Sequence, residues 1–166
     1  MSIRILVVDD NDILREDLCQ QLAKQPDFTV AGSASTGAEA VEKALSIDCD
    51  LILMDIEMRF MDGMTAAEKL RALDPYVIIV FVTNMRSFAV EGYKVGALDF
   101  VMKPVGRPVL RSLLRKVDRI LLRTRGSKGT VKTWGGGIKL LDADEIYYVE
   151  VARHHLVFHT EGGELD

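Results

Sequence analysis

The sequence predicts an α/β domain built on a parallel sheet with helices on both faces, followed by a short β-rich segment. Strand-like and helix-like stretches alternate five times over the first three quarters of the 166-residue chain. The stretch Leu51–Met54 is apolar at every position, which is typical of a strand buried on both faces. After a Gly- and Ser-containing stretch at 125–129, the pattern changes to short strands separated by glycine turns.

The five β-α units can be placed in order along the chain. We expect strands at Ile3–Val8, Thr29–Gly32, Leu51–Met54, Val77–Val82 and Phe100–Met102. We expect helices from near Asp12, after Thr36, over Met64–Leu73, over Ser87–Val95, and from Pro108 to about Arg123. Thr36 and Glu39 form a capping box for the second helix. The apolar faces of the first two helices should comprise Ile13, Leu14, Leu18, Leu22, Ala40, Val41, Ala44 and Leu45.

Composition and charge exclude several classes of protein. With 48% hydrophobic and 28% charged residues, the chain is typical of a globular protein and not of a disordered one. The net charge of −4 argues against binding nucleic acid through charge alone. Cys19 and Cys49 lack CxxC spacing, which favours buried thiols in a reducing compartment. There is no signal-peptide pattern or membrane-length apolar run, so we expect a cytoplasmic protein that does not contact membranes.

Polar side chains follow four of the predicted strands. They are Asp9 and Asp10, Asp55, Thr83, and Lys103. Because the carboxyl ends of parallel strands meet at one edge of the sheet, we expect these groups to converge. The carboxylates would repel one another unless a cation sat among them, and Mg²⁺ suits such a site. An ammonium and a hydroxyl beside them would stabilise a phosphoryl group, so the set predicts phosphoryl transfer onto Asp55.

Each of these residues also has a simpler interpretation. Asp9 and Asp10 would serve as caps of the first helix, Thr83 as a turn residue, and Lys103 as a solvated charge. Their shared position at strand ends favours a functional site. A phosphatase or phosphomutase that uses Asp55 as nucleophile is an alternative, with Glu57 two residues on as the acid. A flavin mononucleotide binder is another alternative, but no Ser/Thr/Gly-rich phosphate loop follows the first strand.

Several stretches together resemble the receiver domain of bacterial two-component response regulators over residues 1–123. The matching stretches are Ile5–Asn11, Leu53–Met58, Met61–Gly63, Phe81–Thr83, Gly96–Phe100 and Lys103-Pro104. The resemblance implies a flavodoxin-like sheet of strand order 2-1-3-4-5. It also implies a signalling protein, not an enzyme beyond its own phosphotransfer and dephosphorylation, whose Asp55 accepts a phosphoryl group from a sensor histidine kinase.

The resemblance assigns roles to individual residues. Mg²⁺ would be held by Asp10 directly, Asp9 through water, Asp55, and the backbone carbonyl of Glu57. Thr83, Lys103 and Phe100 would bind the phosphoryl group or respond to it, with Thr83 and Phe100 as the switch pair. Arg59 and Phe60 depart from the family pattern, in which proline and a small or polar residue are usual. This departure motivates a further alternative, a receiver-like interaction module that is never phosphorylated.

The stretches Asp144–Val151 and His154–Thr160, near the end of the chain, together resemble the start of a LytTR-type DNA-binding domain. We expect a linker at 124–130 and an incomplete β domain at 131–166, with strands at Ile138–Leu141, Glu145–Val151 and His155–Thr160. The resemblance implies that a complete LytTR domain binds DNA to regulate transcription. It makes Arg153 and His154 candidate DNA contacts, and both are also ordinary turn residues.

A stripe of arginines follows one face of the last α-helix of the receiver-like part. It comprises Arg107, Arg111, Arg115, Arg119 and Arg123, each four residues apart. The simpler interpretation is a solvated face. The sharper hypothesis is a homodimer contact or a surface for the effector domain, with Asp99 as a partner residue.

Overall fold

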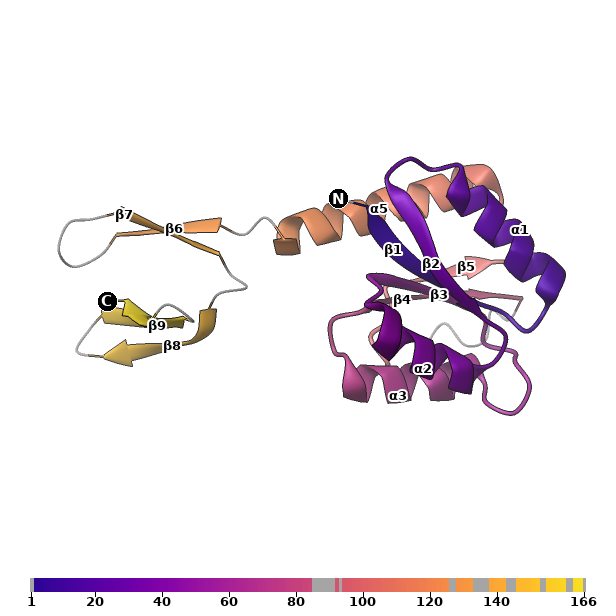
Figure 1. Cartoon of the computed structure of the whole chain (residues 1–166), viewed down its shortest axis with the longest axis horizontal. Helices are drawn as coiled ribbons and strands as arrows, with labels where there is room; N and C mark the ends of the chain where they lie inside the picture. The colour runs from indigo at the N-terminus through magenta and orange to yellow at the C-terminus, as the bar shows by residue number, and fades with distance from the viewer. Residues whose placement is uncertain are drawn as a thin grey trace. The chain divides into compact units, whose positions relative to one another are not determined.

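The computed structural model describes residues 2–84, 92, 94–125, 128–132, 138–142, 146–152, 155–160 and 163–165 (Figure 1). The chain divides into two compact units, residues 1–114 and 115–166. No helix within the described ranges is both long enough and apolar enough to cross a membrane.

The first unit contains a five-stranded parallel sheet of order β2-β1-β3-β4-β5. Its strands are β1 Ile3–Val8, β2 Phe28–Ala34, β3 Leu51–Met54, β4 Ile78–Thr83 and β5 Asp99–Met102. The predicted flavodoxin-like fold and strand order are therefore confirmed. Every residue of β3 is buried, as expected for the central strand of a sheet covered on both faces.

The helices are α1 Asp12–Ala23, α2 Gly37–Ile47, α3 Gly63–Leu73 and α5 Arg107–Arg125. Figure 1 shows α2 and α3 on one face of the sheet and α1 with the start of α5 on the other. The helix predicted at Ser87–Val95 falls largely outside the described residues.

Short polar side chains set where the helices begin. The Asn11 side chain accepts hydrogen bonds from the N–H groups of Ile13 and Leu14, and Asp62 caps α3 in the same way. The predicted capping box at α2 is present in modified form. Thr36 accepts from the Glu39 N–H, whereas Glu39 reaches back to the N–H of Ser35 instead of Thr36.

Side chains alternate along the strands and supply a core on each face of the sheet. Toward α2 and α3, Leu6, Ile52 and Ile79 are paired in register and completely buried. Toward the other helices, the buried side chains include Leu18, Leu22, Leu110, Leu113 and Leu114. Each such side chain stabilises the fold by about 1.5–3 kcal/mol relative to an exposed one.

The predicted apolar faces are wrong at three helix positions, because Ile13, Leu14 and Leu45 are all exposed, Leu14 at 37%. The Ile13 side chain is 80% exposed, because it lies in the first turn of α1 and faces away from the sheet. Leu45 on α2 is 56% exposed, whereas Ala40 on the same helix is completely buried. Hydrophobic spacing defines a face, but it does not define how far that face extends at each end of a helix.

The second unit contains antiparallel strands, as the change in pattern predicted. They are β6 Lys128–Lys132, β7 Ile138–Asp142, β8 Ile146–Ala152, β9 His155–Thr160 and β10 Gly163–Leu165. β6 pairs with β7, and β9 lies between β10 and β8. β6 begins inside the stretch 124–130 that the sequence suggested as linker.

Candidate functional site

The carboxyl ends of the four neighbouring strands β1, β3, β4 and β5 hold the predicted residues at one edge of the sheet. The Asp55 N–H donates to the carbonyl of Val8 at 2.8 Å, so Asp55 continues the pairing of β3 with β1. The Asp9 N–H likewise extends the pairing of β1 with β2. The Lys103 N–H donates to the carbonyl of Thr83 at 3.0 Å and extends the pairing of β5 with β4. Backbone hydrogen bonds therefore position these side chains.

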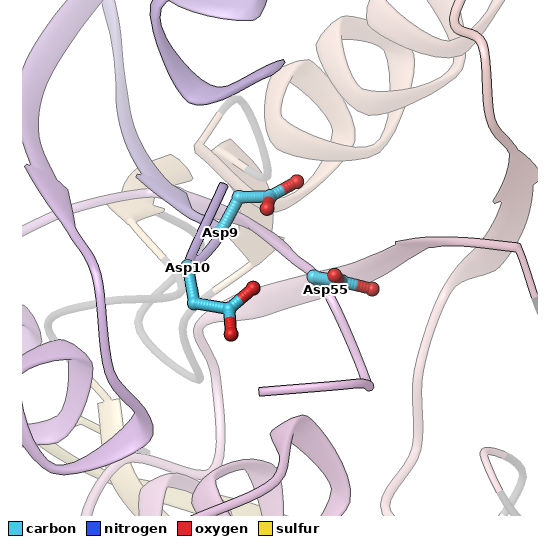
Figure 2. Close-up of side chains that lie close together, drawn as sticks. All are labelled: Asp9, Asp10 and Asp55. Atoms are coloured by element: carbon cyan, nitrogen blue, oxygen red, sulfur yellow. The ribbon is translucent and has the colours of Figure 1, made fainter. Parts of the chain in front are cut away.

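Asp9, Asp10 and Asp55 form a cluster in which each offers a carboxylate oxygen within 4.8 Å of the others (Figure 2). Asp9 is 6% exposed and Asp55 is 5% exposed, while Asp10 is partly exposed. Hard carboxylate oxygens at this spacing are the ligands that Mg²⁺ prefers, with water completing its octahedron. The convergence expected from the sequence is present, and the donor set fits a divalent cation.

Lys103 joins two of these carboxylates. Its Nζ lies 2.7 Å from Asp9 Oδ2 and 2.8 Å from Asp55 Oδ2, and all three side chains are nearly buried. The three carboxylates and one ammonium, when ionised, leave two negative charges uncompensated. That excess attracts a divalent cation to the partly exposed side, where Asp10 lies.

Burial and ion pairing shift the pKa values of Asp55 and Lys103 in opposite directions. Burial raises the pKa of Asp55 above its ordinary value, and the neighbouring Asp9 adds to the shift, although the Lys103 ammonium opposes it. Burial lowers the pKa of Lys103, but its hydrogen bonds to Asp55 and Asp9 outweigh this effect and raise the pKa overall. Lys103 therefore stays protonated at neutral pH and keeps its charge at the site.

Capping of α1 does not account for the acidic residues. Asn11 is the residue that caps the helix, through its side-chain oxygen. Asp9 Oδ1 accepts the N–H of Asn11 at 2.8 Å, while its other oxygen binds Lys103. The simpler interpretation of Asp9 and Asp10 as the helix cap is therefore wrong.

Thr83 and Phe100, which the resemblance predicts to be a switch pair, lie on the strands β4 and β5 beside this cluster. The Thr83 side chain is completely buried at the end of β4. Phe100 is paired in register with Phe81, and their ring centroids are 5.1 Å apart. Thr83 and Phe81 are two residues apart on one strand, so both face the same side of the sheet as Phe100.

The loop after β3 carries the two residues that depart from the family pattern. Arg59 and Phe60 are both exposed, and Phe60 has a positive φ of 67°. The Glu57 side chain is also exposed, while its N–H donates to Asp55 Oδ1 at 3.4 Å. At the end of the loop, a Cβ on Gly63 would lie 2.0 Å from the carbonyl oxygen of Asp55. Only glycine therefore fits at position 63 with this loop geometry.

Comparison with known proteins identifies the family. The family model described as "Response regulator receiver domain" matches residues 5–115. The chain belongs to the response regulator receiver domain family. Its structure is similar to the crystal structure of the response regulator domain of Thermotoga maritima CheB, with a TM-score of 0.66 and 35% identity. That match covers 72% of this chain and 96% of the other.

The chain is also similar to parts of longer proteins. It is 42% identical over 104 residues to protein-glutamate methylesterase/protein-glutamine glutaminase 1 of Methanosarcina mazei, covering 61% of this chain and 29% of that protein. It is 38% identical over 134 residues to the second such protein of Carboxydothermus hydrogenoformans, covering 75% and 38%. The match to each of these proteins thus spans well under half of its length.

The remaining candidate residues are two residues of the second unit and the arginines of α5. Arg153 and His154 lie outside the described residues. The five arginines of the predicted stripe on α5 are exposed, and two of them, Arg107 and Arg111, line a cavity of about 150 Å³ with Lys24 and other residues. These cavity residues do not include any member of the acidic cluster of the receiver domain.

Sequence reasoning missed the roles of three residues. Gly63 packs against the Asp55 backbone and Gly92 packs against the Phe100 ring. The sequence does not predict these contacts, because they form only when the chain is folded. Asn11 offered a signal, because an Asn directly before a helical pattern is a strong cap.

Proposed function

We propose that this receiver domain accepts a phosphoryl group on Asp55 from a sensor histidine kinase, in a Mg²⁺-dependent reaction. The observation that carries the proposal is the cluster of Asp9, Asp10 and Asp55 with the Lys103 ammonium at the carboxyl ends of the strands. Membership of the receiver family supports it.

The chemistry follows from the contacts of Asp55. A carboxylate oxygen of Asp55 attacks phosphorus, the bond from phosphorus to the donor's imidazole nitrogen breaks, and an aspartyl phosphate forms. The electron pair of the broken bond stays on that nitrogen. Lys103, now 2.8 Å from Asp55 Oδ2, is placed to pair with a phosphoryl oxygen, and Thr83 to donate to another. Bound Mg²⁺ would neutralise the charge that develops on the phosphoryl oxygens.

The residues proposed to hold Mg²⁺ are Asp10, Asp9 through water, Asp55, and the backbone carbonyl of Glu57. The separation of the three carboxylates supports this set. In this proposal Thr83 and Phe100 change position when Asp55 is phosphorylated, which shifts the population between two packings.

The proposed output is transcription regulation through a LytTR-like DNA-binding domain, of which residues 131–166 are the beginning and Arg153 and His154 the candidate DNA contacts. The antiparallel strands β6 to β10 support a β-rich output segment. An enzymatic output is the competing candidate, because the relatives are methylesterases by name. Binding of labelled DNA and methylesterase activity, both measured on protein that carries the complete output domain, separate the two.

The remaining parts of the proposal concern surroundings and partners. Cys49 is buried and burial raises the pKa of its thiol to about 11, which suits a protonated thiol in the reducing cytoplasm. A homodimer through the arginine face of α5 stays a proposal, and charge reversal at Arg115 tests it by changing the association state. The chain is proposed to act as a switch that catalyses only its own phosphotransfer and dephosphorylation.

Intact-protein mass after incubation with acetyl phosphate tests the central step. We expect a gain of one phosphoryl group that requires Mg²⁺ and is absent from Asp55→Asn. The matched control is Asp27→Asn, an exposed carboxylate before β2, which should gain the group like the wild type. A folded wild type that gains nothing would instead favour a phosphorylation-independent interaction module, with the Arg59-Phe60 loop as the first region to examine.

A further inference from the structure

The backbone of Gly92 lies directly against the ring of Phe100. A Cβ at position 92 would lie 2.2 Å from Phe100 Cε2 and 2.3 Å from Cζ. Carbon atoms in contact are normally about 3.5–4.0 Å apart. The ring therefore occupies the space that the side chain of any other residue would fill.

The backbone around Gly92 is held in place by hydrogen bonds. The Ala97 N–H donates to the Gly92 carbonyl at 3.0 Å, and Gly96 between them has a φ of 63°, as in a Schellman helix end. Arg71 Nε donates to the Val95 carbonyl at 3.0 Å and anchors this end to α3. These bonds oppose a retreat of the backbone from a larger residue at position 92.

The backbone of Phe100 is also fixed, so only its ring is free to change position. Phe100 is paired with Phe81 in the sheet, and its N–H donates to Asp99 Oδ1 at 2.8 Å. The ring is held by packing against Phe81 and Gly92. Moving it requires rotation about side-chain bonds and breaks no hydrogen bond of its own.

The ring is connected to the acidic cluster through β4. Phe81, against which the ring packs, lies two residues before Thr83 on the same face of the sheet. Thr83 is completely buried, and its carbonyl accepts the N–H of Lys103. Displacement of the Thr83 side chain therefore changes the packing available to the ring.

We propose that Gly92 is a positioning residue: by lacking a side chain, it admits the Phe100 ring to the space beside Phe81 and gives the ring two alternative positions. The ring leaves or enters this space when the state of Asp55 changes. The packing part of the inference stands on the contacts alone, whereas the response to Asp55 rests on the proposed phosphorylation.

A thermal-unfolding cycle tests the packing part with Gly92→Ala, Phe100→Ala and the double variant of the full chain. Alanine has a higher helix propensity than glycine, so Gly92→Ala should raise the Tm of the Phe100→Ala variant, in which the ring is absent. In protein that retains Phe100, we expect Gly92→Ala to lower the Tm, because the new methyl group forces the ring out of its space. The matched control is Gly106→Ala, whose Cβ would meet only an ordinary contact at 3.7 Å and should act alike in both backgrounds.

A Tm shift of opposite sign with and without the Phe100 ring is expected only if Gly92 and the ring are in contact. If Gly92→Ala fails to fold and the double variant folds, the rescue supports the same contact. A Tm shift of equal sign and size in both backgrounds would overturn the proposal.

Fluorine NMR of protein labelled with 4-fluorophenylalanine tests the response to Asp55, with the Phe100 signal assigned by Phe100→Leu. In the wild type we expect acetyl phosphate and Mg²⁺ to shift this signal. In Gly92→Ala the signal should be displaced before phosphorylation and should then move by less than half as much. Intact mass measured on the same samples reports phosphorylation.

The phosphorylation measurements and the thermal-unfolding cycle test different parts of the inference, so each can give a negative result without the other. A mass that never increases counts against the proposed function, while the unfolding cycle still decides the packing claim. A phosphorylated Gly92→Ala protein whose Phe100 signal moves as far as in the wild type would overturn the inference.

Discussion

The two ends of the candidate site are held in place by different forces. The acid end, which comprises Asp9, Asp10, Asp55 and Lys103, is held by ion pairs of 2.7 and 2.8 Å between nearly buried groups. The ring end, which comprises Phe81, Phe100 and Gly92, is held by packing. Charged hydrogen bonds are directional and strong in a buried setting, whereas packing permits more than one arrangement.

This difference suits two separate roles within the receiver domain, a fixed acid end and a ring end that changes its packing. The acid end keeps its carboxylates at fixed positions before a phosphoryl group arrives, so little reorganisation is needed during the reaction. The ring end changes packing without breaking a hydrogen bond of the ring. A small free-energy difference between two packings is enough to shift the population, and in the proposed function phosphorylation of Asp55 would supply this difference.

Gly63→Ala should have the largest effect, because the atoms it meets at the acid end belong to the backbone. Its Cβ would lie 2.0 Å from the Asp55 carbonyl oxygen and 2.9 Å from Ile56 Cα. We expect the free energy of unfolding, measured with urea, to fall by about 3 kcal/mol or more. Unlike Gly92→Ala, the variant should not be rescued by Phe100→Ala. A loss as small as that of Gly106→Ala would show that the loop is freer than the contacts indicate.

Lys103→Met should destabilise the protein by about 2–4 kcal/mol at neutral pH, since it leaves Asp9 and Asp55 buried without their cation. Without the ammonium, the pKa of the Asp55 carboxyl group rises further above its ordinary value. The loss should therefore shrink as the pH falls and Asp55 becomes protonated. Urea unfolding across the pH range measures this, with the exposed Lys69→Met on α3 as the control. A loss that is independent of pH would mean that packing of the Lys103 stem, and not its charge, stabilises the acid end.

Asp55→Asn should stabilise the fold by about 1 kcal/mol at neutral pH. The pKa of Asp55 is raised by burial, so the folded state holds its proton more tightly than the unfolded state does. The ionised form therefore reduces stability once the pH passes above the ordinary value of 3.8, and below that value the advantage of Asn should vanish. Thermal unfolding at neutral and acid pH measures the difference, with Asp27→Asn as control. A destabilised Asn variant would mean that the pairing with Lys103 outweighs burial.

Glu39→Gln should have the smallest effect, because its ion pair with Lys43 is about a third exposed. Hydrogen bonds from Lys43 and from the N–H of Ser35 lower the pKa of Glu39 to about 2. Stability from this group is present above its ordinary value of 4.5 and is lost as the pH falls toward 2. With solvent screening, we expect at most about 1 kcal/mol, measured as the wild-type minus variant stability against pH. A difference that grows toward acid pH would contradict the assignment.

Much of the fold could be predicted because its pattern is local. The apolar run Leu51–Met54 predicted a fully buried strand, and the polar residues after each strand predicted a common edge. Those rules depend on chain direction and side-chain alternation, which the sequence contains. The strand order came from the family resemblance.

The parts that could not be predicted depend on contacts between distant segments. Ile13 has the spacing of a core residue, yet the first turn of α1 turns it toward water. Lys103 was expected as a partner of the phosphoryl group, and the structure adds that it already bridges Asp9 and Asp55. The contact of Gly92 with Phe100 joins residues whose packing no periodicity encodes.

Chemical mapping of the phosphorylated carboxyl group tests the central claim most directly. Borohydride reduces an aspartyl phosphate to the alcohol, so a protein treated with acetyl phosphate, Mg²⁺ and then borohydride carries homoserine at the modified position. Peptide mass spectrometry then distinguishes Asp55 from Asp9 and Asp10, which lie in a different peptide. We predict homoserine at position 55 alone. Homoserine at position 9 or 10, with Asp55 unchanged, would contradict the assignment of Asp55 as the phosphoryl acceptor.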